Sequence, residues 1–570
     1  MTRRTIALVT IVSLLTACDS PSEPVTEVAD IVLTNGKFLT MDNDFSTAEA
    51  MAIKDDRIMF VGSQGKVLEL RGPDTRVIDL EGRTATPGII DSHMHFAQLG
   101  RRIHQLFLTD TNSAAEVVDL VRAKAETSVP GDWITGDGWH TAAWGGAGYP
   151  DGDALNEAMP ANPVFLRGMS WHAAWVNDVV LDMAGITRDT PDPVGGKIVR
   201  DSETGEPTGV LLETATKLVE AVLPQESRDD LKAIIKASNE AALAMGITTV
   251  HDARANDKEI ALYREMIANG DLNVRMYLMY HVDEFSTAFD EMLEHAPEIG
   301  SGDNHLTQRT FKIFSDGALG ARGAALLERY SDDESSVGLL RNSGAEIDQI
   351  VGKIMNAGYQ VAYHAIGDRA NRLVLDAIEN TQLRYSLEDA RPRIEHAQIL
   401  SMQDLPRFGK LGVIASMQPL HFSLDMAFAE ARLGRKRMQG AYAWRSLIDS
   451  GATIVANADA PFSPVRHSDP LIGIYAAVTR RSLEGVSFGE DYSAQRVTRR
   501  EAIEMYTVNA AYAGFEEDLK GSLVPGKLAD ITVWSKDISA IEAEELLATK
   551  VVMTMIGGDI VYDPNGLLTN

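Results

Sequence analysis

Short apolar runs broken by turn-forming residues occur near both ends of the chain. Such runs, bounded by Gly, Pro, Asn and Asp, are typical of β-strands. They comprise Ile31–Leu33, Met51–Ile53, Ile58–Val61 and Val77–Leu80 near the start, and Ala529–Trp534, Val551–Met555 and Ile560–Tyr562 near the end. We predict that residues 31–85 and 522–565 together form one small β-sandwich.

The central part of the chain, residues 86–521, alternates short apolar runs with segments of helical periodicity. This alternation predicts βα units and a parallel sheet. Because eight parallel strands close a TIM barrel, we predict the α/β class and a (β/α)8 barrel. The eight expected strands are Ile89–His95, Ile247–Asp252, Val274–His281, Phe311–Ser315, Tyr359–His364, Arg393–His396, Val413–Met417 and Thr453–Asp459.

The gap between the first two expected barrel strands is too long for a simple crossover. It contains about 150 residues, whereas connections in α/β units are short. We therefore predict a large insertion after barrel strand one, over residues 97–245, which covers the active-site end of the barrel as a lid. Trp139, Trp144 and Trp171 lie within it.

Composition and charge exclude several classes of partner. The formal net charge of −29 over 570 residues argues against binding to nucleic acid or to anionic membrane surfaces. The single cysteine, Cys18, excludes an intramolecular disulfide, a cysteine-based metal site and a thiol nucleophile in the barrel. We expect a small-molecule substrate as the partner. The sequence leaves the oligomeric state open, with a homodimer among the options.

The N-terminus has the pattern of a targeting segment. Two arginines precede an apolar run, Thr5–Leu15, that is too short to span a membrane. The following Leu15-Thr-Ala-Cys18 resembles a bacterial lipobox. We expect a signal peptide over residues 1–17 and a lipidated tether over residues 18–30, which anchors the exported protein to a bacterial membrane, facing the periplasm or the exterior. The alternative is an ordinary signal peptide with an incidental cysteine.

The ends of the expected barrel strands, where the chemistry of such barrels takes place, are unusually polar, and the first, fifth, sixth and eighth carry the candidate metal ligands. A single His-x-His pair is as well explained by mutual hydrogen bonding, but several imidazoles at corresponding strand ends have no packing rationale. Imidazole and carboxylate without thiolate suit Zn²⁺ or a similar divalent ion. The sequence therefore predicts a metal site, formed by His93, His95, His364, His396 and Asp459.

Lys312 alternates with apolar residues on the fourth expected strand. A buried lysine is costly unless it is paired or chemically altered, and burial makes its neutral, nucleophilic form accessible. The alternative is a lysine whose ammonium group extends from the barrel mouth into solvent.

These residues lie in motifs that resemble the amidohydrolase superfamily, specifically its amidohydrolase-3 branch of YtcJ-like and N-substituted formamide deformylase-like proteins. The resemblance extends from Ile31 to Tyr562. The matching motifs are Pro87–His95, Gly136–Trp139, His172–Asn177, Gly205–Leu211, Lys312–Gly317, His364–Arg369, Ile394–His396, Gln418–His421, Asp459–Pro461 and Lys520–Asp530.

The resemblance implies a binuclear centre with two divalent ions, Zn²⁺ being the expected metal. One ion would lie between the two histidines of strand one and Asp459. The other would lie between the histidines of strands five and six. Lys312 would carry a CO₂-derived carboxylate that bridges both ions. The implied ligands are thus His93, His95, Lys312, His364, His396 and Asp459.

In this scheme Lys312 and Asp459 are the catalytic residues. The two ions supply hydroxide from a bridging water, and Asp459 takes its proton and passes it to the leaving nitrogen. We therefore predict a binuclear hydrolase that cleaves a non-peptide C–N bond in an N-acyl, N-formyl or cyclic amide. One departure from the branch is Asn457-Ala458, where Gly-Ser is usual, and it weakens any transfer of substrate by analogy.

Two other functional classes stay open. The same metals would support an esterase, a lactonase or a deaminase. A non-catalytic surface lipoprotein could keep the fold for binding, although the complete set of ligands argues against it. Candidate substrate contacts, several of which have an equal structural alternative such as a turn or a local salt bridge, are Trp139, Trp171, His172, Asp316, Arg369, Gln418 and His421.

Overall fold

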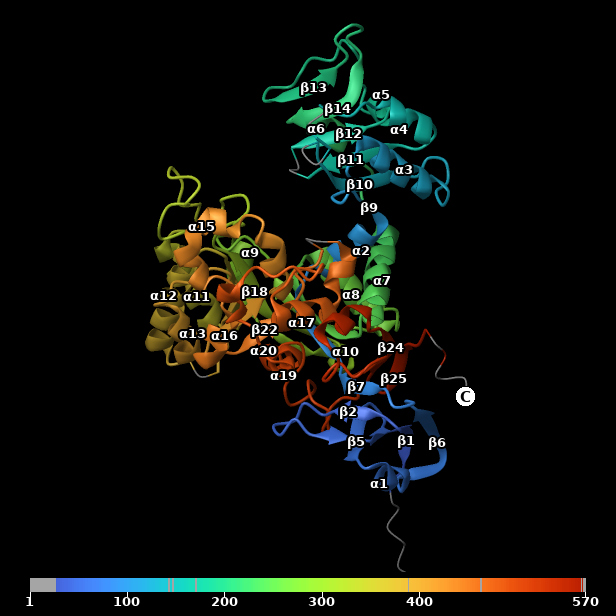
Figure 1. Cartoon of the computed structure of the whole chain (residues 1–570), viewed down its shortest axis with the longest axis vertical. Helices are drawn as coiled ribbons and strands as arrows, with labels where there is room; N and C mark the ends of the chain where they lie inside the picture. The colour runs from blue at the N-terminus through green and yellow to red at the C-terminus, as the bar shows by residue number, and fades with distance from the viewer. Residues whose placement is uncertain are drawn as a thin grey trace, which may run out of the picture.

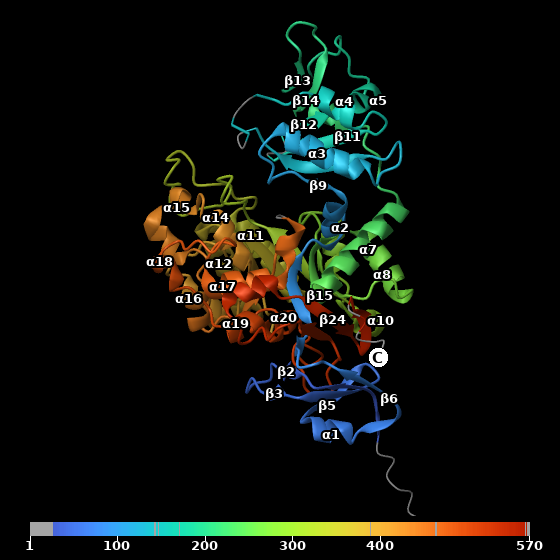
Figure 2. The same cartoon turned by 45° about the vertical axis from the view of Figure 1, so that its right-hand side comes forward.

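The computed structural model describes residues 27–141, 144–145, 148–169, 172–387, 389–461, 464–564 and 566. These residues form three parts along the long axis of the molecule (Figure 1, Figure 2). A β-sandwich lies at one end, a barrel in the middle and the insertion at the other end. The signal peptide, Cys18, most of the tether and Trp171 lie outside the described residues.

Eight parallel strands form the barrel, so the predicted (β/α)8 barrel is confirmed, and the short strand β17 (Glu298–Gly300) joins the same sheet in antiparallel orientation. Its first and last strands approach each other where Ser92 Oγ donates to the carbonyl oxygen of Ala456 at 2.9 Å, so the sheet is nearly closed. In sheet order the strands are β8 (Ile89–Met94), β15 (Ile247–Ala255), β16 (Arg275–Tyr280), β18 (Leu306–Phe314), β19 (Gln360–Ala365), β20 (Arg393–His396), β21 (Ile414–Met417) and β22 (Ile454–Ala456).

Helices surround the barrel strands and share one apolar core with them. Several begin at a capping box, as at Ser227, Asn256 and Ser343, where side chains satisfy the free N–H groups of the first turn. The longer barrel helices are α2 (Phe96–His104), α7 (Arg228–Ala244), α8 (Asp257–Ala268), α11 (Gly344–Asn356), α12 (Asp368–Tyr385), α15 (Ala429–Arg437) and α17 (Pro470–Thr479). Shorter ones include α9 (Thr287–Leu293), α13 (Leu405–Leu411), α14 (Pro419–Asp425), α16 (Trp444–Asp449), α19 (Arg499–Glu504) and α20 (Val508–Ala513).

The β-sandwich contains strands from both ends of the chain, as predicted. Its two sheets share an apolar core to which Leu33 and Val533 both contribute. One sheet has the order β5 (Arg57–Gly62), β4 (Ala50–Lys54), β1 (Ala29–Thr34) and β6 (Arg71–Asp79). The other has the order β25 (Asp559–Tyr562), β24 (Val551–Ile556), β23 (Ile531–Trp534), β7 (Thr84–Pro87), β2 (Lys37–Leu39) and β3 (Thr47–Ala48).

Strand β7 leads directly into barrel strand β8 through Gly88. A Cβ atom at this position would lie 2.2 Å from the hydroxyl oxygen of Thr248, so the close approach of the two strands requires glycine. The β-sandwich is thereby attached to the strand that carries His93.

The insertion has a mixed six-stranded sheet with helices on both faces, and its two small cores follow from strand alternation. In β11, Val164 and Leu166 pack on the side of α3 and α4, whereas Phe165 packs on the side of α5 and α6. In sheet order the strands are β13 (Gly196–Arg200), β14 (Pro207–Glu213), β12 (Ala173–Val176), β11 (Val164–Gly168), β10 (Ile134–Trp139) and β9 (Leu106–Phe107). The helices are α3 (Ala114–Ala125), α4 (Asp153–Ala158), α5 (Asp178–Met183) and α6 (Thr216–Glu220).

The insertion's own sheet and helices occupy less of the chain than the predicted range 97–245. Helices α2 and α7, at the two ends of that range, belong to the barrel, because Leu99 and Ile235 pack into the barrel core. The elements of the insertion itself run from β9 to α6.

Candidate metal centre

The two histidines of the His-x-His motif converge, although they do not share a strand. Strand β8 ends at Met94, one residue earlier than expected, and His95 is the N-cap residue of α2. The His95 backbone N–H donates to the carbonyl oxygen of Ala460 at 2.9 Å, which attaches it to the loop after β22. The ring centroids of His93 and His95 are 5.7 Å apart.

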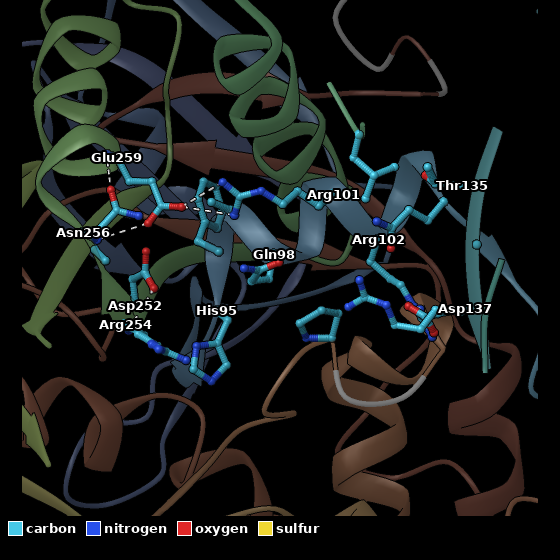
Figure 3. A pocket seen from close by; sticks show the side chains of 18 of the residues that line it. His95, Gln98, Arg101, Arg102, Thr135, Asp137, Asp252, Arg254, Asn256 and Glu259 are labelled. Carbon is cyan, nitrogen blue, oxygen red and sulfur yellow. Dashed lines mark hydrogen bonds and ion pairs between the residues drawn. The ribbon is translucent and has the colours of Figure 1, made fainter. Parts of the chain in front are cut away.

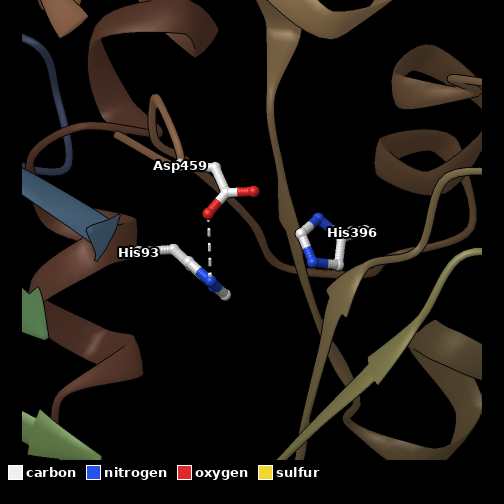
Figure 4. A group of neighbouring side chains, drawn as sticks. All are labelled: His93, His396 and Asp459. Atoms are coloured by element: carbon white, nitrogen blue, oxygen red, sulfur yellow. Dashed lines mark ion pairs between the residues drawn. The ribbon is translucent and has the colours of Figure 1, made fainter. Parts of the chain in front are cut away.

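His93, His396 and Asp459 form the centre of the cluster (Figure 4). Each is buried, and one donor atom from each lies within 4.8 Å of the others. Strand β22 ends at Ala456, so Asp459 lies in the following loop, with φ at 50°. This loop places Asp459 Oδ1 3.5 Å from Nε2 of His93 and 3.5 Å from Nε2 of His95.

Lys312 and His364 complete the group from the neighbouring strands β18 and β19. Lys312 Nζ lies 3.2 Å from His93 Nε2, and the ring centroids of His364 and His396 are 4.4 Å apart. The structure therefore brings together all six positions that the sequence assigns to metal binding.

The nitrogen and oxygen atoms of this cluster are better suited to binding a cation than to hydrogen bonding with one another. Among the described residues, both ring nitrogens of His364 and Oδ1 of Asp459 are buried without a hydrogen bond. Buried polar atoms of this kind are normally satisfied. Imidazole nitrogen and carboxylate oxygen are ligands of first-row divalent metals, so a bound ion would satisfy them.

Burial sets the protonation states that metal binding requires. It lowers the pKa of His93 to about 4, with help from the Lys312 cation, and that of His396 to about 3. Burial likewise lowers the pKa of His364 well below its ordinary value. Burial opposes ionisation of Asp459, but the surrounding imidazoles outweigh it and hold the pKa of that carboxyl below its usual range. The cluster thus offers neutral imidazoles and a carboxylate.

Glu395 orients His93, a role that was not anticipated from the sequence. The Nδ1 atom of His93 is hydrogen-bonded to Glu395, which leaves Nε2 directed at the cluster. Arg393 holds Glu395 in turn, with 2.8 Å between Nε and Oε1, and it also donates to His251 Nδ1 at 2.9 Å. Arg393 and Glu395 alternate on the fully buried strand β20, and that pattern of buried charges was the available signal.

Gln418, predicted as a substrate contact, is hydrogen-bonded to a histidine of the cluster and orients it. The Nδ1–H of His396 donates to Gln418 Oε1 at 2.9 Å. Gln418 Nε2 donates to Asn457 Oδ1 at 2.8 Å, and Asn457 Nδ2 donates to Ser416 at 3.1 Å. Asn457, noted above as a departure from the branch, is therefore part of the support of His396.

Asp91 connects strand β8, which carries His93, to the loop that carries Asp459. It is fully buried, and its carboxylate accepts the backbone N–H groups of His93 at 3.0 Å and Ala458 at 3.2 Å. Burial raises the pKa of Asp91 to about 7. These two hydrogen bonds fix the position of His93 relative to the loop before Asp459.

Asp316, Arg369 and His421 occupy three different environments. Asp316 is buried 3.5 Å from His364 Nε2, where its carboxylate accepts backbone N–H groups of neighbouring loops, including that of Gly367 at 2.8 Å. Arg369 is exposed in the first turn of α12, and His421 is half-buried on α14, three residues after Gln418.

The insertion holds Trp139 and His172. Trp139 is buried in the insertion's core, where its indole stacks on Trp144 and its Nε1–H donates to the carbonyl oxygen of Leu166 at 2.9 Å. The exposed side chain of His172 lies 2.9 Å from Glu213. The structure therefore joins neither side chain to the cluster described above.

A cavity of about 720 Å³ lies between the barrel mouth and the insertion (Figure 3). His95, Asp252 and Arg254 line it from the barrel, and Thr135 and Asp137 line it from the insertion. His95 belongs both to this wall and to the cluster, so the cavity is the natural substrate site for chemistry at the cluster.

The chain belongs to the amidohydrolase family, whose model matches residues 76–562. YtcJ of Bacillus subtilis is 33% identical over 93% of this chain and 98% of its own length. The N-substituted formamide deformylase of Arthrobacter pascens is 28% identical over 95% of this chain and 100% of its own. An uncharacterized metal-dependent hydrolase from Pyrococcus horikoshii has a similar structure, with a TM-score of 0.73 and 27% identity over 90% of this chain and 99% of that one.

Proposed function

We propose that this protein is a metal-dependent hydrolase that cleaves a non-peptide C–N bond in an N-acyl, N-formyl or cyclic amide. The observation that carries the proposal is the convergence of His93, His396 and Asp459, with donor atoms within 4.8 Å, beside a cavity of about 720 Å³. The similarity to a formamide deformylase along its whole length supports an amide as the substrate.

In this proposal His93, His95 and Asp459 hold one divalent ion, and His364 and His396 hold a second. When bound, such ions act as Lewis acids on a carbonyl group and lower the pKa of water, and zinc is the expected metal. Glu395 and Gln418 fix the ring orientations of His93 and His396. Asp459 is ionised and faces the cluster, so it can take a proton from water and return it to the leaving nitrogen.

Lys312 is proposed to carry a carboxylate formed with CO₂, which would bridge the two ions. Burial lowers the pKa of Lys312 to about 8, so a neutral amine able to attack CO₂ is available near neutral pH. Its Nζ lies beside His93 Nε2, and the ring of His93 lies 5.3 Å from that of His396, so Lys312 is placed next to residues proposed to hold each ion.

The experiment that tests this function is turnover by metal-loaded protein. Purified protein is stripped with chelator, reloaded with Zn²⁺ and assayed on N-formyl amines, N-acyl amines, cyclic amides and lactones. We expect hydrolysis of at least one amide class, lost on chelation and restored by metal. If lactones are hydrolysed and none of the amides is, the protein is a lactonase and the proposed amidase function is wrong.

We also propose export and lipid anchoring through Cys18, which rests on the sequence of residues 1–26 alone. Within the part of the chain that the structure describes, we find no helix with the length and apolar character needed to cross a bilayer. Cys18→Ser should move the protein from the membrane fraction to the soluble exported fraction without a change in kcat. Wild-type protein in the cytoplasm would contradict the proposal.

A further inference from the structure

The substrate cavity contains one arginine whose charge the protein does not neutralise. Four arginines line the cavity. Among the described residues, Arg254 forms no ion pair and no side-chain hydrogen bond, and it is exposed. The other three are paired with carboxylates, as Arg101–Glu226, Arg102–Asp137 and Arg167–Glu220.

The acidic residues near Arg254 are already engaged. Asp252 accepts the Tyr263 hydroxyl at 2.9 Å through Oδ2, and its Oδ1 accepts the backbone N–H of Arg254 at 3.3 Å. Glu259 pairs with Arg101 at 3.1 Å and also accepts the N–H of Asn256 in a capping box. The Arg254 guanidinium lines the cavity, and its five donors therefore have no protein acceptor among the described residues.

The position of Arg254 places this charge close to the proposed reaction centre. Arg254 is the last residue but one of β15, at the same end of the barrel as the cluster, and its side chain extends toward His95 in the cavity wall (Figure 3). The Nε2 atom of His95 lies 3.5 Å from Asp459.

We propose that Arg254 binds a carboxylate group of the substrate while the scissile amide lies at the cluster. The inference rests on the hydrolase function proposed above and specifies its substrate class as an N-acyl or N-formyl amide that carries a carboxylate. A guanidinium binds a carboxylate with two parallel hydrogen bonds, and an unpaired cation in a cleft attracts anions. The whole chain has a formal net charge of −29, so an unpaired arginine in this cavity does not follow from a basic composition.

The test compares pairs of amides that differ only in the carboxylate. N-formyl-phenylalanine is paired with N-formyl-2-phenylethylamine, and equivalent pairs are made on leucine and alanine skeletons and with acetyl in place of formyl. We expect zinc-loaded wild type to favour the carboxylate member by about tenfold or more in kcat/KM, as a charge-assisted bidentate contact provides. Arg254→Gln should remove that preference while it changes the neutral member by less than about twofold.

Three variants separate recognition from structural damage. Arg254→Lys should keep part of the preference, because the charge remains without the bidentate geometry. Arg254→Glu should disfavour the carboxylate member further, through like-charge repulsion. Arg122→Gln is the matched control, since Arg122 is an exposed arginine of α3, paired with Asp119, that does not line the cavity. It should leave both members unchanged.

Binding provides a readout that does not depend on turnover. The same pairs are titrated into zinc-loaded wild type and Arg254→Gln by calorimetry. Failure of wild type to hydrolyse any amide would count against the proposed function, while tighter binding of the carboxylate members would still support the role of Arg254. Equal affinity of wild type for both members, or an equal loss for both in Arg254→Gln, would overturn the inference.

Discussion

Lys312 Nζ lies 3.2 Å from Nε2 of His93, and both side chains are only 1% exposed. An amine and an imidazole in such contact give each other no charge compensation, since the imidazole of His93 is neutral. Lys312 Nζ can donate a hydrogen bond to His93 Nε2 in this arrangement, and a carboxylate formed on Lys312 would lie beside the ion proposed at His93. The same pair therefore links the proposed carboxylate to the proposed metal.

Replacement of Lys312 tests that link. Lys312→Ala should lower kcat by at least about 100-fold and reduce metal content, because the bridging group is lost. Formate or acetate at high concentration should restore part of the activity by occupying the vacated position. Lys353→Ala, on the exposed surface of α11, is the control. Normal turnover by Lys312→Ala would contradict the proposed carboxylation of Lys312.

Glu395 should control the affinity for metal without binding it. Glu395→Gln removes the charged acceptor of His93 Nδ1–H, and loss of such an orienting partner typically weakens metal binding by about 10–100-fold. Zinc affinity is measured by competition with a chromophoric chelator, with circular dichroism to verify folding. Glu298→Gln, at a more exposed pair with Arg264, serves as the control. An unchanged zinc affinity would show that Glu395 has only a structural role.

His396 should make the metal-free protein sensitive to acid. Its folded pKa of about 3 lies below the ordinary value of 6.5, so between these values the unfolded chain binds a proton that the folded chain does not. The contribution of His396 to the free energy of unfolding is therefore complete above pH 6.5. It decreases by about 1.4 kcal/mol per pH unit as the pH falls from 6.5 towards 3.

The His396 contribution can be isolated by difference. Urea unfolding of wild type and His396→Gln is measured in EDTA at pH 7.5 and pH 5.5. The stability advantage of wild type over the variant should shrink at the lower pH, because other titrating groups such as Asp91 are common to both proteins. A difference independent of pH would mean that His396 is not buried in neutral form.

Trp139 should stabilise the insertion rather than contact substrate. Trp139→Ala removes a buried indole that packs against Trp144 and Trp175, a change that typically costs about 3–5 kcal/mol. Hydrogen exchange should increase in β10 and β11, while zinc content per folded chain stays constant. Trp139→Phe should show a smaller effect. Unchanged exchange together with an altered KM would instead support the original expectation of a substrate contact.

Strand periodicity was sufficient to predict the fold because the barrel strands are short, largely buried runs that alternate with helical segments. It placed His93, Lys312, His364 and His396 on strands of one sheet, in which β18, β19 and β20 are direct neighbours. It failed at Asp459 and His95, which lie beyond the strand ends, because the course of a loop depends on tertiary contacts such as that of His95 with Ala460.

The roles of other polar side chains could not be predicted from the motif spacing. A motif gives the identity of Gln418 but not which polar group it faces, and the structure shows that it faces His396. Trp139 was predicted as a substrate contact from its motif, whereas the structure shows its side chain in the insertion's core. The free charge of Arg254 depends on which nearby carboxylates are already paired, and that information is absent from the sequence.

The most direct test of the account is the metal content of the pure protein. Elemental analysis should find about two divalent ions per chain in zinc-loaded wild type, and the His364→Ala and His396→Ala variants should each approach one ion with a loss of activity. Wild-type protein that hydrolyses amides at full rate with no bound metal, or a His396→Ala variant that keeps both ions and full activity, would contradict the assignment of this cluster as the metal centre.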